Sequence, residues 1–147
     1  MNTETSYSAG ETKKGFTRFL PAIARVLLGL PLTVFGLNLF LNFIPEPKME
    51  IPEGAMAFAA ALKNSGYMMQ LIGATQLIVG VLLLTNRFVP LALALFAPFI
   101  VNSFAFHVFL ERSGLPMTCV FVALELYLAW CYRDAYRTML AAKVRPA

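Results

Sequence analysis

The sequence predicts an all-α integral membrane protein, a bundle of four membrane-spanning helices with both termini in the cytoplasm. Of its 147 residues, 59% are apolar and 14% are charged, and the mean hydropathy is +0.68. Soluble domains average about 45–50% apolar and about 25% charged residues. One span needs roughly 20 residues, so the chain has room for about four spans and no separate soluble domain. This composition excludes a disordered chain, a disulfide scaffold and an ordinary cytosolic enzyme.

Four apolar runs predict the four spans, at about residues 19–44, 66–84, 90–110 and 115–132. Residues 1–18 and 133–147 form polar tails, the second of them basic, and residues 45–65 form the one long connection. In that connection five alanines favour a short helix at residues 54–62. Met56, Phe58 and Leu62 would anchor this helix to the membrane surface.

Positive charges divide unevenly between the two predicted sides. The side with both tails and the turn after the second span carries eight Lys and Arg, and the other side carries three. Lys and Arg gather on the cytoplasmic side of membrane proteins, so we expect a bacterial inner-membrane protein with its long connection outside. The eight are Lys13, Lys14, Arg18, Arg87, Arg133, Arg137, Lys143 and Arg145, and the three are Lys48, Lys63 and Arg112.

The remaining composition restricts the partners and cofactors. The formal charge of +4 is not arranged as a basic stripe with aromatic platforms, so we expect a lipid bilayer and no nucleic acid as partner. The sequence has no Cys/His cluster, Gly-rich phosphate loop or nucleophile triad. We therefore expect no metal site and no intrinsic cofactor, and a single histidine excludes bis-histidine haem.

Three polar residues inside the spans form a predicted inner polar layer. Counted at about 1.5 Å per residue from the cytoplasmic ends, Arg25, Gln76 and Glu125 lie roughly 9, 12 and 10 Å deep. Ionisable groups in hydrocarbon are costly and mark functional sites. Three interpretations stay open: a structural Arg–Glu ion pair completed by the amide, a layer that binds a ligand head or relays protons, and an arginine that extends to the headgroups alone.

A second polar layer is predicted nearer the outside. Ser103 and His107 are four residues apart and share a helix face. His107 is interpreted either as a hydrogen-bonded packing residue or as a ligand-handling group, together with Asn102. The layer consists of Asn38, Asn42, Gln70, Asn102, Ser103 and His107.

Two glycine pairs predict where helices touch. Gly29 and Gly36 are seven residues apart on the first span, and Gly73 and Gly80 are seven apart on the second. Each pair lies on one helix face, where the absence of a side chain lets backbones approach closely.

The same residues resemble the DoxX and DoxX-like membrane proteins over about residues 19–137. The first span opens with Ala24-Arg25-Val-Leu-Leu-Gly29 and continues with Phe35-Gly36-Leu37. The second reads Gly73-Ala-Thr-Gln76-Leu-Ile-Val-Gly80, followed by Asn86-Arg87. The stretches from Asn102 to His107, Leu115-Pro116, Tyr127-Leu-Ala-Trp130 and Tyr132-Arg-Asp134 are similar to the DoxX-like branch.

The resemblance implies a four-helix membrane bundle linked to sulfur-compound oxidation, with a quinone as acceptor. We therefore expect a small subunit or accessory of a quinone-linked redox assembly, with no catalytic activity of its own. The family commonly has Glu at the position of Gln76, so a proton-transfer role does not carry over easily. The alternative is a non-enzymatic scaffold that stabilises partner membrane proteins or forms a homo-oligomer. A small-molecule carrier is disfavoured because four helices enclose little volume.

Overall fold

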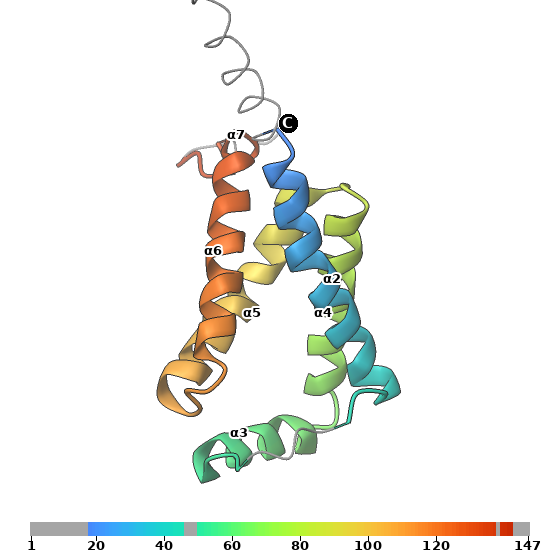
Figure 1. The fold of residues 1–147 in the computed structure, drawn as a ribbon, viewed down its shortest axis with the longest axis vertical. Coiled ribbons are helices and arrows are strands. Elements are labelled where there is room, and N and C mark those ends of the chain that lie inside the picture. Colours follow the sequence, from blue (N-terminus) through green and yellow to red (C-terminus); the bar gives the residue numbers. More distant parts are fainter. Residues whose placement is uncertain (1–17, 46–49, 138, 143–147) are drawn as a thin grey trace, which may run out of the picture.

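The computed structural model describes residues 18–45, 50–137 and 139–142, and in these ranges the chain is helical without any strand. The prediction of an all-α fold is confirmed. Both predicted tails lie mostly outside the described residues, as does Lys48. The helices are α2 (Leu20–Leu41), α3 (Glu53–Asn64), α4 (Met68–Leu84), α5 (Val89–Phe109), α6 (Leu115–Cys131) and α7 (Arg133–Tyr136), shown in Figure 1.

Two of these helices, α2 and α5, are long and apolar enough to cross a membrane alone. A third candidate is the pair α3 and α4, which bends by 91° at its break, and α6 is a shorter apolar helix. Helices α4 and α6 have 17 residues each and are therefore about 25 Å long.

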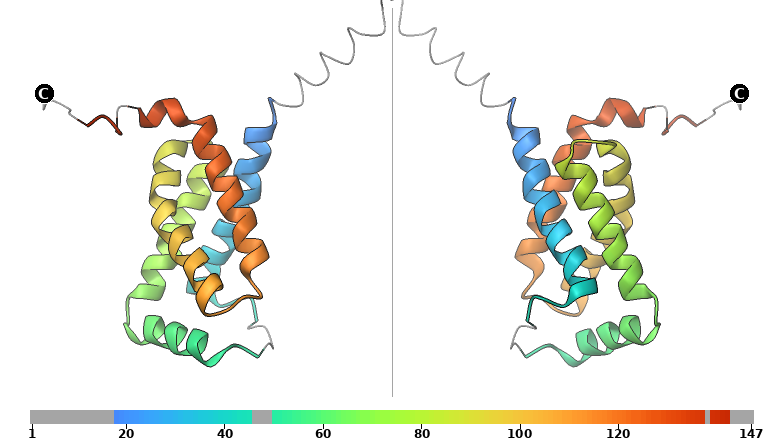
Figure 2. Two further views of the ribbon diagram at one scale, coloured as in Figure 1. Left: turned by 90° about the vertical axis from the view of Figure 1, so that its left-hand side faces the viewer. Right: turned by 90° about the vertical axis from the view of Figure 1, so that its right-hand side faces the viewer.

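Helices α2, α4, α5 and α6 pack side by side as one helix group, with α2 against α4 and α5 against α6. The two chain ends that are described, at α2 and α7, lie at the same end of this group (Figures 1 and 2). We call this the terminus end, and it also holds the turn 85–88 between α4 and α5. The opposite end, covered by α3, is called the α3 end.

The closest packing is between the backbones of α2 and α4. A Cβ atom added at Gly36 would lie 2.7 Å from the nitrogen of Leu77 and 2.9 Å from the oxygen of Gly73. One added at Gly80 would lie 2.7 Å from the nitrogen of Thr33 and 2.8 Å from the oxygen of Gly29. All four glycines singled out for helix packing therefore line this single contact.

The buried apolar core lies toward the terminus end. It takes residues from the first half of α2, the last half of α4, the first half of α5 and the last turns of α6. Its members are Ala24, Leu28, Leu32, Val79, Leu83, Val89, Ala92, Leu93, Phe96, Ile100 and Leu128. Away from this core, the α2–α4 pair and the α5–α6 pair diverge toward the α3 end (Figure 1).

The outer surface of the helix group is apolar as well. Large hydrophobic side chains are exposed on every helix of the group, among them Phe35, Ile78, Val101, Val120 and Leu126. Exposed apolar surface of this extent marks a face that contacts lipid or another protein.

Helix α3 covers the segment 54–62 for which the sequence predicts a helix, and it crosses the α3 end of the helix group (Figure 2). The ring of Phe58 lies 5.6 Å from that of Phe106 on α5, measured between centroids. This aromatic contact joins α3 to the far end of α5. Its predicted position on a membrane surface stays a prediction.

Candidate functional site

The residues of the predicted inner layer come from three helices of the group. Gln76 on α4 and Glu125 on α6 are only 8% and 6% exposed, and Arg25 on α2 is half-buried. All three therefore direct at least part of their polar side chains into the protein.

The predicted salt bridge between Arg25 and Glu125 is not formed. The ion pairs among the described residues join His107 to Glu111 and Arg137 to Asp134. No hydrogen bond among the described residues joins any two of Arg25, Gln76 and Glu125 either.

The register of α2 against α4 explains why the three residues do not form one layer. Gly29 packs beside Leu83 and Leu84, whereas Gly36 packs beside Gln76. Arg25 is eleven residues from Gly36 on the same helix, which corresponds to about 16 Å along the axis. The equal depths expected from the sequence assumed that the spans end in one plane, but α2 extends beyond the end of α4.

Each of the three side chains instead has buried polar atoms without a partner among the described residues. They are Nε and Nη1 of Arg25, Oε1 of Gln76 and Oε2 of Glu125. A buried polar group left unpaired costs about 1–3 kcal/mol. Polar atoms at such a cost are expected to meet a ligand, a water molecule or a partner protein.

Tyr136 is a further polar residue at the terminus end, which the sequence reasoning did not single out. Its hydroxyl donates a hydrogen bond of 2.8 Å to the carbonyl oxygen of Pro90, and the Tyr132 hydroxyl lies 3.4 Å from Oδ1 of Asn86. Burial, and secondarily the charge of Glu125, raise the pKa of Tyr136. The only available signal is that Tyr132 and Tyr136 are four residues apart, on one helical face, at the end of the last apolar run.

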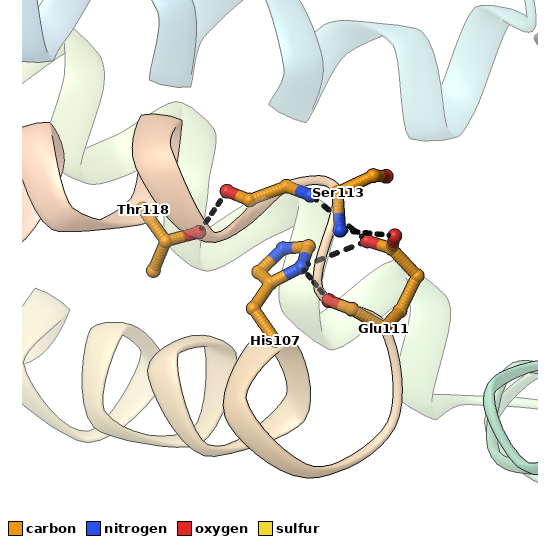
Figure 3. A network of polar contacts seen from close by, with 5 residues as sticks. His107, Glu111, Ser113 and Thr118 are labelled. Atoms are coloured by element: carbon orange, nitrogen blue, oxygen red, sulfur yellow. Dashed lines mark hydrogen bonds and ion pairs between the residues drawn. The ribbon is translucent and has the colours of Figure 1, made fainter.

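His107 lies in a separate polar network at the turn between α5 and α6 (Figure 3). Its Nδ1 is 3.0 Å from Oε2 of Glu111 and 2.9 Å from the backbone oxygen of Glu111. The same carboxylate accepts hydrogen bonds from the backbone nitrogens of Ser113 at 2.6 Å and Gly114 at 3.1 Å. The Thr118 hydroxyl then donates to the oxygen of Gly114 at 3.1 Å.

This network closes a turn and starts a helix. The imidazole lies directly against Gly114, where an added Cβ would be 2.6 Å from Nδ1 of His107. Every described partner of the ring belongs to the turn or to Phe106, whose ring it meets edge-on. The contacts therefore support the interpretation of His107 as a hydrogen-bonded packing residue.

The other residues of the predicted outer layer have different surroundings. Asn42 ends α2 in a left-handed conformation, and Oδ1 of Asn38 accepts a hydrogen bond of 2.7 Å from the nitrogen of Ile44. Both asparagines thus shape the end of α2. Gln70 and Asn102 are exposed, and their side chains make no hydrogen bond with the described part of the chain. The outer layer is therefore not one site.

No group of His, Cys, Asp and Glu among the described residues could hold a metal ion. Cys119 and Cys131 are both free and exposed. No family model, curated protein or solved structure matches the chain. The functional argument accordingly rests on the residues and their geometry.

The network at Glu111 predicts a dependence of stability on pH. Hydrogen bonding to Ser113, above all, lowers the pKa of Glu111 from its ordinary 4.5 to about 2. A carboxyl group with a lowered pKa stabilises the fold above 4.5, and this contribution is lost as the pH falls through about 2. Thermal unfolding in detergent should therefore show an advantage of wild type over Glu111→Gln that shrinks across this range. The matched variant Glu50→Gln removes an exposed carboxylate and should leave the pH profile unchanged, and an unchanged profile for Glu111→Gln would contradict the assignment.

The absence of an ion pair between Arg25 and Glu125 predicts additive effects. The unfolding free energies lost in Arg25→Leu and Glu125→Leu should sum to the loss in the double variant within about 0.5 kcal/mol, as for separate sites. A double-mutant cycle measured by denaturation in detergent checks this. His107 and Glu111 are in contact, so the cycle of His107→Gln and Glu111→Gln should show coupling and serves as the control. Clear recovery of stability in the Arg25→Leu/Glu125→Leu double variant would restore the ion pair.

Proposed function

We propose that the chain is a multi-pass protein of the bacterial inner membrane, with α2, α4, α5 and α6 as a bundle of four spans and both termini in the cytoplasm. The apolar outer surface of all four helices supports this proposal. Helices α4 and α6, with 17 residues each, meet the lower limit of about 17 residues for a span. An even number of spans also agrees with the described chain ends lying at one end of the helix group.

The distribution of described cations supports the orientation. Arg18 and Arg87 lie at the terminus end, as do Arg133 and Arg137 beside α7, while Lys63 and Arg112 lie toward the α3 end. The positive-inside rule then assigns the terminus end to the cytoplasm and α3 to the periplasmic surface.

Reporter fusions test this topology. A fusion after Ala147 should report the cytoplasm, and a fusion inserted at Pro45 should report the periplasm, because an odd number of spans separates the two positions. The activities of paired cytoplasmic and periplasmic reporters measure this. Equal location of both fusions would refute the four-span arrangement.

Within this membrane protein we propose the role of a DoxX-type accessory subunit in a quinone-linked redox assembly. The observation that carries the proposal is the buried carboxyl of Glu125, whose Oε2 has no partner among the described residues. Oε1 of Gln76 is a second acceptor oxygen of the same kind. A quinol carries two hydroxyl donors, so either oxygen fits one end of its polar head. A bound quinone would accept or release electrons, and the side chains of this chain would bind and orient its head.

The alternative role is a non-enzymatic scaffold for other membrane proteins. It is favoured by Asn102, whose exposed side chain lies within α5 and makes no hydrogen bond with the described residues. Polar side chains facing lipid are costly, and amides commonly hydrogen-bond across neighbouring helices. A second copy or a partner helix at α5 would satisfy Asn102.

Copurification distinguishes the two roles. Mass spectrometry of protein purified in mild detergent should detect bound quinone in wild type and in Asn102→Leu. The Glu125→Leu variant should retain about tenfold less quinone or lower, since a hydrogen bond to such a group contributes about 1.5–3 kcal/mol. Circular dichroism provides the check that each variant is folded. Absence of quinone from wild type, together with a partner protein that is lost in Asn102→Leu, would favour the scaffold.

A further inference from the structure

The terminus end of the α2–α4 pair carries positive charge without any acid nearby in the sequence. No Asp or Glu occurs from Arg18 to Pro45 or from Asn64 to Leu110. Arg18 directly precedes α2, Arg25 lies in the second turn of α2, and Arg87 lies in the turn after α4. This end therefore attracts an anion.

The register brings Arg25 to the level of Arg87. Gly29 packs beside Leu83 and Leu84, at the end of α4. Arg25 is four residues before Gly29 and shares its face of α2, so it lies beyond the end of α4, beside the turn 85–88. Arg18 is seven residues before Arg25 and lies on the same face.

Arg25 has donors available for an anion at this place. Its Nε and Nη1 are buried and have no hydrogen-bond partner among the described residues. Like charges at one level repel each other, and an anion between them removes this repulsion while it satisfies the guanidinium donors.

An apolar groove begins beside these cations on the surface of α2. It has a volume of about 300 Å³ and is lined by Phe19, Ala22, Ile23, Val26 and Leu27. From Phe19 to Leu27 it follows the helix for about 12 Å. A groove of this kind next to a cationic cluster matches a molecule with an anionic head and an apolar chain.

We propose that the terminus end of α2 binds an anionic phospholipid. The phosphate lies among Arg18, Arg25 and Arg87, and one acyl chain lies in the groove along α2. Basic pockets of membrane proteins recognise anionic headgroups in this way. The proposal rests on the membrane-embedded part of the proposed function and is independent of the quinone.

Native mass spectrometry of the protein in nanodiscs of mixed phosphatidylglycerol and phosphatidylcholine tests the proposal directly. Wild type should retain phosphatidylglycerol in preference to phosphatidylcholine. Arg25→Gln should reduce this preference by about five- to tenfold, because one cation near an anionic headgroup contributes an effect of that size. The control Arg112→Gln removes an exposed cation at the α3 end and should retain the wild-type preference.

A groove variant and a soluble anion separate a lipid from free phosphate. Ala22→Phe fills the groove and should reduce the retention of phosphatidylglycerol, whereas inorganic phosphate should not raise the thermal stability in detergent. Stabilisation by inorganic phosphate with no effect of Ala22→Phe would assign a free anion and overturn the lipid proposal. Wild type that enters nanodiscs folded but retains both lipids equally would also overturn it. Failure of wild type to enter nanodiscs at all would instead refute the membrane-embedded function on which it rests.

Discussion

The direct contact between the backbones of α2 and α4 sets the positions of the other elements. Four glycines on two helices allow this approach, and a Cβ atom at Gly36 or Gly80 would collide with main-chain atoms of the neighbouring helix. Main-chain atoms cannot move aside as a flexible side chain can, so the contact permits one register. That register places Gln76 beside Gly36 and leaves Arg25 beyond the end of α4. It thereby decides which polar groups can meet.

Much of the helix pattern follows from the sequence because it depends on local properties. Uninterrupted apolar runs without acids predict α2, α4 and α5, and the alanines of residues 54–62 predict α3. The glycines with a spacing of seven were also informative, since a repeat of seven keeps residues on one helix face. The relative heights of the helices are not local. They follow from which glycine meets which backbone, and a count from the ends of the apolar runs contains no such information.

The candidate site shows the same limit. Burial of Gln76 and Glu125 is expected from their apolar neighbours in the sequence, but their separation from Arg25 is not. Glu111 joins His107 through a turn that no spacing rule describes, and Tyr136 reaches Pro90 across 46 residues. Charge opposition alone suggested that Arg25 and Glu125 would pair. The structure instead leaves unpaired donors on α2 and unpaired acceptors on α4 and α6, which are two separate requirements for outside partners.

The concentration of the core at the terminus end has a consequence for motion. Near Leu28 and Phe96 the helices are locked by close packing, whereas at the other end the two helix pairs diverge and are connected by α3. Local opening requires the least free energy where few apolar contacts are broken. Backbone amides near α3 should therefore exchange their hydrogens through small separations of the two pairs, and those around the core only through global unfolding. The helix group thus has a firm half and a compliant half, and a molecule entering between the pairs would do so at the compliant one.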